Sequence, residues 1–450
     1  MSADRFKPLE PLVTRLVPEG SGEFDRARDR VVWNKRLAQS RTPAAIVTVS
    51  SAAEAAAAVR FAAENGLTVS PRGGGHNYQA SVLRDGGMLL DLGGLDSVEI
   101  DSAARTARVG VGVEGGALSK QLAKMGFAFP VGHCVDVALS GYLIGGGFGW
   151  NAGHWGAACA NVTAINMVTA TGEIVLASAT EHADLFWAAR GHGPGFFAAV
   201  TAFHLQLHPY PRHVYAWRIA FAASSAPVLA DWLTAAVAAS PAHTEVGCFL
   251  FAHWDTGEHA IVLRVSACGE SEAEARHTVA PFTSPPPDAR LIGEASGRSL
   301  AFTDLFELSP MPSGKRVAAD HLWSDAAIGD LLLAVHDLPA PSKDSTIDIV
   351  AFGGHTPVPI PDDAALSVSG GTGIGIYGLW DEAADDAVNR AWVREVDAKL
   401  APFRTGRYVA EADLTADPER RSQCFTPDAL ERLRELRRRY DPDGVFATWP

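Results

Sequence analysis

The first part of the chain alternates between short apolar runs and a helical pattern. Residues 45–49 and 67–70 are strand-length runs rich in apolar and β-branched side chains. Residues 52–64 between them are rich in alanine, with a serine pair just before them that can cap a helix and Gly66 after them that can end it. The pattern predicts a strand–helix–strand unit, whose two strands run parallel in one sheet.

Further elements follow before residue 210. Apolar runs and period-two alternation predict strands at residues 88–92, 98–101, 105–113, 161–170 and 173–177. Helical spacing with glycine or polar boundaries predicts helices at residues 115–125 and 184–189. The densest clusters of glycine lie in the connections between these elements.

After residue 210 the strands become longer and alternate more regularly, as in residues 215–220 and 247–252. Helices are predicted at residues 226–238 and 271–279, and this middle part carries no cofactor motif. It predicts an antiparallel sheet with flanking helices that binds a substrate. A basic amphipathic helix at residues 427–439 is expected to return to the first part.

The length predicts two domains, because 450 residues exceed one ordinary core. We therefore expect an α+β fold in which residues 1–210 form a first domain. Residues 211–400 form the antiparallel-sheet domain, and residues 401–450 return to the first.

Composition and charge limit the classes of molecule that the protein is expected to bind. The formal net charge of −14 disfavours nucleic acid and anionic membranes and leaves a small molecule as the expected partner. The start of the chain has no apolar leader, and no run of 18 apolar residues follows, so a cytoplasmic protein is expected. The five cysteines show no spacing typical of a metal site, and their odd number excludes complete internal disulfide pairing. Nothing in the sequence indicates an oligomeric state.

Two glycine runs indicate a bulky phosphate-containing ligand. Residues 72–77 read Arg-Gly-Gly-Gly-His-Asn, and residues 145–149 read Gly-Gly-Gly-Phe-Gly. Without side chains, the backbone N–H groups of such loops can approach a pyrophosphate closely. The spacing differs from the dinucleotide fingerprint of a Rossmann helix, and there is no Walker lysine, so NAD and ATP fit poorly. Because glycine triplets also occur in ordinary turns, the residues alone leave the ligand open.

Residues 45–208 resemble the FAD-binding domain of the vanillyl-alcohol oxidase superfamily, also called the PCMH-type domain, and most closely its berberine-bridge-enzyme-like branch. The resemblance rests on the Arg-Gly-Gly-Gly-His motif at 72–76, followed by Met-Leu-Leu-Asp-Leu at 88–92. It also rests on a cysteine eleven positions before the second glycine run, and on Asp-Leu-Phe-Trp-Ala-Ala-Arg-Gly at 184–191. Residues 440–446 resemble the closing element of the branch.

The resemblance implies a covalently bound FAD. His76 falls on the histidine that bonds to the flavin 8α-methyl carbon, and Cys134 falls on the cysteine that bonds to ring carbon C6. The other positions that the resemblance assigns to the cofactor are Arg72, Gly73, Gly74, Gly75, Asn77, Val137, Ser140, Gly141, Gly145, Gly146, Gly149, Asn161, Ile174 and Tyr408. Taken alone, His76 could cap a turn and Cys134 could be a small buried hydrophobic residue.

Catalysis is expected near the C-terminus. The resemblance makes Tyr408 the candidate that activates a substrate hydroxyl, with a phenol pKa lowered by a nearby positive group. Glu411 is the alternative base, but on an extended strand a step of three residues turns it to the opposite face. Tyr408 could equally be an ordinary strand tyrosine, and Arg407 replaces the asparagine usual in the branch.

Aromatic residues of the middle part form a second candidate set. They could line a substrate pocket or belong to the core of the sheet. The set comprises Trp217, Phe249, Phe251, His253, Trp254, Tyr377 and Trp380.

The expected activity is that of a flavin oxidase. It would oxidise a small or medium organic substrate, most commonly an alcohol to a carbonyl in secondary metabolism, by hydride transfer to flavin N5. Val137 occupies the position that gates oxygen in the branch, and valine there favours O2 as acceptor with release of H2O2. Ala138 replaces a glycine that lies near the flavin in relatives. A dehydrogenase using another acceptor and a flavin-binding protein without turnover are the alternatives, and the sequence does not name the substrate.

Overall fold

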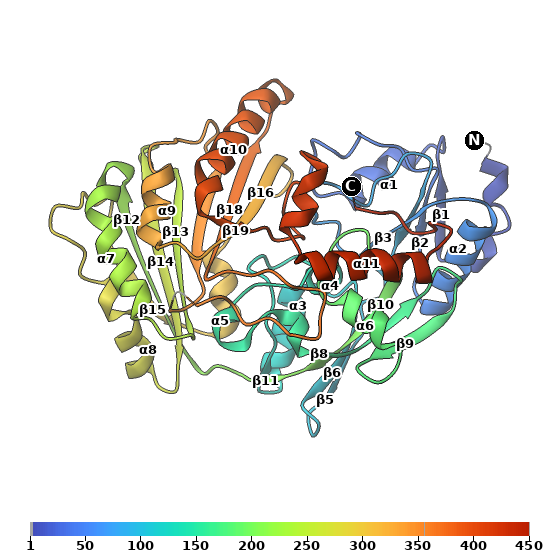
Figure 1. The fold of residues 1–450 in the computed structure, drawn as a ribbon, viewed down its shortest axis with the longest axis horizontal. Coiled ribbons are helices and arrows are strands. Elements are labelled where there is room, and N and C mark those ends of the chain that lie inside the picture. The colour runs from blue at the N-terminus through green and yellow to red at the C-terminus, as the bar shows by residue number, and fades with distance from the viewer. Residues whose placement is uncertain (1–2, 355, 450) are drawn as a thin grey trace.

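The computed structural model describes residues 3–354 and 356–449. Figure 1 shows a large sheet with its helices on the left and two smaller sheets on the right. The predicted α+β fold is confirmed, since helices and mostly antiparallel strands are mixed along the whole chain.

The first sheet contains the predicted strand–helix–strand unit. Its strands run in the order β1 (Arg15–Pro18), β2 (Ala45–Thr48), β4 (Met88–Asp91) and β3 (Val69–Arg72). Helix α2 (Ala52–Glu64) joins β2 to β3, and both strands pair in parallel with β4 between them. Its start is capped as predicted, because the Ser51 side chain accepts a hydrogen bond from the backbone N–H of Glu54.

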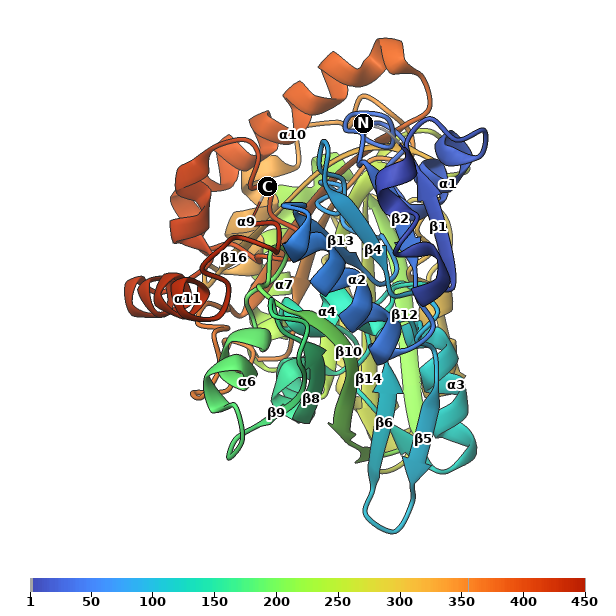
Figure 2. The same ribbon diagram turned by 90° about the vertical axis from the view of Figure 1, so that its right-hand side faces the viewer.

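The second sheet has five antiparallel strands. Their order is β5 (Val98–Asp101), β6 (Thr106–Gly110), β10 (Ala199–Gln206), β8 (Val162–Val168) and β9 (Ile174–Ser178). Two further short strands, β7 (Phe127–Ala128) and β11 (His208–Pro209), pair with each other as a separate antiparallel ribbon. Figure 2 shows β5 and β6 reaching away from the other elements.

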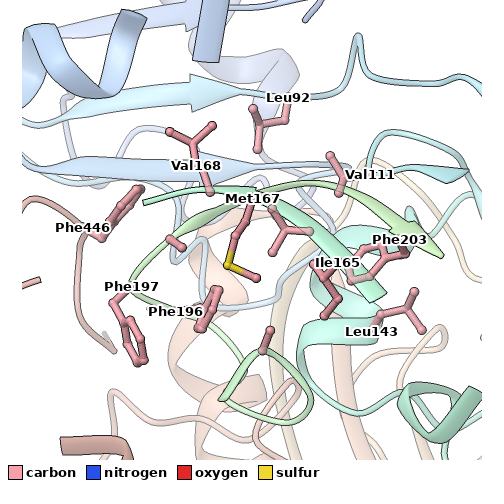
Figure 3. Packing of buried hydrophobic residues seen from close by; sticks show 14 of the residues in the cluster. Leu92, Val111, Leu143, Ile165, Met167, Val168, Phe196, Phe197, Phe203 and Phe446 are labelled. Atoms are coloured by element: carbon pink, nitrogen blue, oxygen red, sulfur yellow. The ribbon is translucent and has the colours of Figure 1, made fainter. Parts of the chain in front are cut away.

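Helices and one apolar core hold these two sheets together. The helices are α1 (Phe24–Val31), α3 (Gly115–Lys124), α4 (Leu139–Ile144), α5 (Ala152–Trp155) and α6 (Ala183–Ala189). Figure 3 shows part of the core, where Met167 and Ile165 of β8 lie among side chains from other elements, such as Leu143 of α4 and Phe203 of β10. This packing fixes the glycine loops that leave the ends of the strands.

The third sheet has eight antiparallel strands. Their order is β15 (Ser296–Leu300), β12 (His213–Ala222), β14 (His259–Gly269), β13 (Thr244–Ala252), β17 (Thr346–Ala351), β18 (Thr372–Trp380), β16 (Arg316–Ser324) and β19 (Arg404–Gly406). One face packs on α7 (Ala226–Ala238), α8 (Glu272–Val279), α9 (Ile328–Val335) and α10 (Asp386–Leu400). Strand β17 shows the alternation plainly, with Ile347 and Ile349 in this core and Asp348 on the other face.

The C-terminal segment packs against the first part of the chain. Helix α11 (Pro427–Tyr440) lies along α6 in Figure 1, and Arg432 of α11 forms an ion pair with Asp184 of α6. After it, the backbone N–H of Val69 donates to the carbonyl oxygen of Val445 at 2.6 Å. Among the described residues, no helix is long and apolar enough to cross a bilayer.

Candidate active site

One cleft lies between the first glycine loop, the segment that carries Cys134 and the open face of the eight-stranded sheet. It encloses about 1860 Å³ of empty space, part of it continuous with solvent. The predicted site residues that line it are His76, Cys134, Arg72, Gly73, Gly74, Gly75, Asn77, Val137, Ser140, Gly141, Tyr408 and Glu411. The structure thus gathers, around one space, residues that lie up to 339 positions apart in the sequence.

Five predicted cofactor residues do not line this cleft: Gly145, Gly146, Gly149, Asn161 and Ile174. Gly149 serves close backbone packing, since a Cβ there would lie 2.0 Å from the carbonyl oxygen of Val131. Asn161 bonds to His208 and to the backbone of Trp155. Ile174 is 49% exposed on the edge strand β9.

The first glycine loop packs directly on the segment that carries Cys134. A Cβ on Gly73 would lie 1.9 Å from Ser140 Oγ and 2.4 Å from Ser140 Cβ, and one on Gly74 would lie 2.8 Å from Ala138 Cβ. Arg72 braces the loop by donating to Asp91 at 2.9 Å and to the carbonyl oxygen of Gly74 at 2.8 Å. Glycine is therefore needed here to bring two stretches of backbone together.

A Gly73→Ala substitution tests this packing. We expect it to lower the free energy of unfolding by about 1–3 kcal/mol, as overpacking does, and to reduce the bound flavin. Thermal unfolding and the flavin absorbance of the purified protein measure both effects. Adding Ser140→Gly removes the clashing side chain and should restore most of the loss; a double variant no better than Gly73→Ala alone would refute this explanation.

The two proposed attachment residues differ in their surroundings. The His76 ring stacks on Trp33 with ring centroids 4.8 Å apart, and its Nε2 lies 3.4 Å from Asp136 Oδ1. Cys134 is half-buried, and burial, reinforced by the Glu411 carboxylate, raises the pKa of its thiol to about 12. Cys134 is therefore a neutral thiol in these surroundings.

The predicted lowering of the Tyr408 pKa is wrong. Burial and the nearby Glu411 carboxylate raise the pKa of the phenol far above its usual value. The phenol oxygen accepts a hydrogen bond from the backbone N–H of Gly147 at 3.2 Å. The neighbouring cation gives no help, because Arg407 is buried against Asp320 and Asp397 at 2.9 and 2.8 Å.

The predicted extended strand around Glu411 is also wrong. The chain turns here, since the backbone N–H groups of Glu411 and Ala412 both donate to the carbonyl oxygen of Tyr408, at 3.1 and 2.9 Å. As a result Tyr408 and Glu411 line the same cleft. Burial raises the pKa of Glu411, and its Oε2 accepts a hydrogen bond from the Tyr377 hydroxyl at 2.6 Å.

The sheet face opposite the glycine loops carries polar residues that the sequence reasoning missed. Glu245 of β13 pairs at 3.1 Å with His133, which lies across the cleft on the segment that carries Cys134, while Arg264, Asp348 and His321 of the sheet line the same cleft. The sequence feature that could have indicated these residues is a charged side chain in an otherwise apolar strand, as at Arg264 and Asp348. Which face such a side chain occupies follows from strand pairing, which was unknown.

Burial shifts the pKa values of the ionisable groups on this side of the cleft. It raises the pKa of Asp348 to about 6 and lowers the pKa of Arg264 to about 10. Burial alone would lower the pKa of His133, but the Glu245 carboxylate against the ring raises it. A carboxyl group with a pKa near neutrality can exchange protons at working pH.

Of the candidate pocket residues in the middle part of the chain, two line the cleft and five do not. Phe249 and Tyr377 line the cleft, where Gly247 and Gly375 leave room for their rings. The remaining candidates do not line it: Trp217, Phe251, His253, Trp254 and Trp380. Trp217 belongs to the helix-covered face, and Trp380 donates to Asp386 at 2.8 Å. Aromatic residues that the prediction omitted complete the lining: Tyr78, Tyr142, Phe148, Phe196, Trp323 and Phe352.

Comparisons with known proteins agree with this geometry. Residues 43–178 match the family model described as an FAD binding domain. The FAD-linked oxidoreductase nodO of Hypoxylon pulicicidum is 28% identical over 96% of both chains, and the (R)-6-hydroxynicotine oxidase of Paenarthrobacter nicotinovorans is 29% identical over 99% of this chain and 98% of its own. Among solved structures, BBE-like 1 of Physcomitrella patens superposes with a TM-score of 0.85 at 20% identity, covering 99% of this chain and 98% of its own.

The chain is an FAD-linked oxidoreductase. Its fold is that of the berberine-bridge-enzyme-like structure. Its cleft fits the cofactor on its own geometry. Buried polar atoms on the lining residues have no hydrogen-bond partner among the described residues, namely His76 Nε2, His321 Nδ1 and Trp323 Nε1. The cleft of this FAD-linked oxidoreductase, between the first glycine loop and the sheet, is therefore the candidate flavin site, and the polar side of the cleft is the candidate substrate side.

Proposed function

We propose that this FAD-linked oxidoreductase is an oxidase that holds FAD through two covalent bonds, at His76 and Cys134. It oxidises a small or medium organic molecule, most simply an alcohol to a carbonyl, and passes the electrons to O2 to form H2O2. The observation that carries the proposal is one cleft into which both attachment residues and the half-buried carboxyl of Glu411 open. In this proposal residues 1–210 hold the cofactor, residues 211–400 supply the substrate side, and residues 401–450 link the two.

Glu411 is the proposed catalytic base. FAD, when bound, supplies the hydride acceptor, and the chain must remove the proton of the substrate hydroxyl. Glu411 lines the cleft with a raised pKa, and the Tyr377 hydroxyl holds its Oε2 in place at 2.6 Å. Tyr408, with its phenol oxygen bonded to the Gly147 N–H, instead fixes the second glycine run in position.

The sheet face is proposed to orient the substrate. The pair of His133 and Glu245, together with Arg264 and Asp348, offers both donors and acceptors inside an otherwise aromatic lining. Buried polar groups of this kind discriminate strongly, because a substrate that fails to satisfy them leaves them unpaired. A substrate with two or more polar groups suits this face.

A panel of benzylic alcohols, phenolic alcohols and reducing sugars tests the activity. We expect at least one compound to bleach the flavin absorbance without oxygen and to release H2O2 in air. Bleaching without peroxide, with fast transfer to an artificial dye, would make the protein a dehydrogenase. A flavin reduced by dithionite but by no compound across a wide panel would favour a flavin-binding protein without turnover.

Val137 lines the cleft and is the proposed oxygen gate. The Val137→Ile variant adds one methylene where O2 must approach, so we expect reoxidation of photoreduced flavin to slow about tenfold, which corresponds to about 1.4 kcal/mol. Stopped-flow mixing with oxygenated buffer measures this rate. Val82→Ile adds the same methylene elsewhere on the lining and should leave the rate unchanged. Equal slowing in both variants would count against a gate at Val137.

A further inference from the structure

The proposed flavin attachment point His76 faces a carboxylate that has no other role in the site. Asp136 lies two residues after Cys134, and its Oδ1 is 3.4 Å from His76 Nε2. That nitrogen is buried and has no hydrogen-bond partner among the described residues. The contact with His76 holds the pKa of the Asp136 carboxyl below its usual value, so this group is an anion at neutral pH.

The ring of His76 is held in one orientation. Trp33 stacks on it with an interplanar angle of 21°. With the ring so fixed, Asp136 faces Nε2, and His76 itself lies on the wall of the cleft. A carboxylate beside Nε2 favours the tautomer that carries its proton there, which leaves the lone pair of Nδ1 free.

We propose that Asp136 is a positioning residue for covalent flavin attachment, which selects Nδ1 of His76 as the nucleophile and stabilises the imidazolium that forms. This inference rests on the proposed bond between His76 and the flavin. The same carboxylate acts oppositely on Cys134, because a negative charge nearby disfavours the thiolate. Asp136 therefore assists one attachment point and not the other.

Covalent attachment in this proposal oxidises the 8α-methyl carbon of FAD. The 8α-methyl carbon of FAD loses one proton to solvent, and Nδ1 of His76 forms a bond to that carbon. The electron pair of the broken C–H bond remains on the isoalloxazine ring, which is thereby reduced by two electrons. O2 takes these electrons and leaves as H2O2, and the imidazolium releases its Nε2 proton. The product carries the mass of FAD less two hydrogen atoms.

Asp136→Asn tests the inference in a background with one attachment point. The Cys134→Ala and Cys134→Ala/Asp136→Asn proteins are prepared free of flavin and mixed with FAD in air. Samples are denatured at intervals, and the intact protein mass is measured by mass spectrometry. We expect covalent FAD to form at least about tenfold more slowly when Asp136 is replaced. Asp136→Glu should restore part of the rate, because it keeps the negative charge.

Two controls separate positioning from folding. Glu114→Gln removes an exposed acid whose backbone pairs with Ala138 of the same segment, and it should leave the rate unchanged. In a His76→Ala background, where only Cys134 can react, Asp136→Asn should not slow attachment.

Equal rates with and without Asp136 in the Cys134→Ala background would overturn the inference while leaving the His76 bond intact. A Cys134→Ala protein that binds FAD but never forms a covalent product would overturn the His76 bond itself, and this inference with it.

Discussion

Replacing Glu411 with glutamine is expected to slow reduction of the flavin by substrate about 10²–10⁴-fold, the usual contribution of a positioned base. Glutamine keeps the size of the side chain but cannot accept the proton of a substrate hydroxyl. The Tyr377 hydroxyl can still donate to the amide oxygen, so the cleft should keep its shape. Anaerobic stopped-flow measurement of flavin bleaching gives the rate directly.

The pH profile of the wild-type protein provides a second readout. Glu411 must be ionised to act as a base, and burial raises its pKa. The rate of flavin reduction should therefore rise with pH, with an apparent pKa above the usual value of a carboxyl group. This pH dependence should disappear in Glu411→Gln.

Tyr408→Phe is the matched control for the rival base. The phenol serves as acceptor for the Gly147 N–H, so its loss should lower the reduction rate less than tenfold. A loss of several orders of magnitude in Tyr408→Phe, with little change in Glu411→Gln, would return the role of base to Tyr408.

The largest effect on stability is expected at Arg407. Its side chain is 2% exposed and bonds to the buried carboxylates of Asp320 and Asp397. Arg407→Met would leave Asp320 paired with Arg420, and Asp397 paired with Arg420 and the more distant Arg404. Breaking a buried pair costs about 3–5 kcal/mol. Urea unfolding followed by far-UV circular dichroism measures the change.

Arg432→Met is the matched control for Arg407→Met, because it removes an arginine from an ion pair at the surface. Arg432 pairs with Asp184 at 3.1 Å with both side chains partly exposed, and such pairs contribute less than about 1 kcal/mol. If the two variants lost the same small free energy, the cluster around Arg407 would not be the anchor of the turn that carries Tyr408 and Glu411.

Local sequence signals predicted the first part of the fold well. The cap at Ser51, the alanine-rich helix α2 and the flanking strands are determined by near neighbours, and the structure reproduces them. The antiparallel middle sheet followed from alternation along its strands. Helix boundaries shifted by only a few residues; for example, the helix predicted from residue 271 begins at Glu272, with Ser271 as its cap.

The substrate side of the cleft could not be predicted, because it depends on contacts between distant residues. The turn at Glu411 is held by Arg407, which bonds to Asp320 87 positions away. The pair of His133 and Glu245 joins residues 112 positions apart. For Trp217 the sequence left pocket and sheet core as alternatives, because both faces of its strand carry apolar side chains and alternation does not reveal which face is open. The structure places it against the helix-covered core.

Intact mass of the denatured protein, recorded beside its visible spectrum, tests the central claim most directly. The measurement compares wild type, Cys134→Ala, His76→Ala and the double variant. We predict that the wild-type chain gains the mass of one FAD less the hydrogen atoms lost on attachment, that each single variant keeps this covalent FAD, and that only the double variant loses it. An unmodified wild-type mass, with FAD released into solution on denaturation, would contradict covalent attachment and leave a non-covalent FAD-linked oxidoreductase.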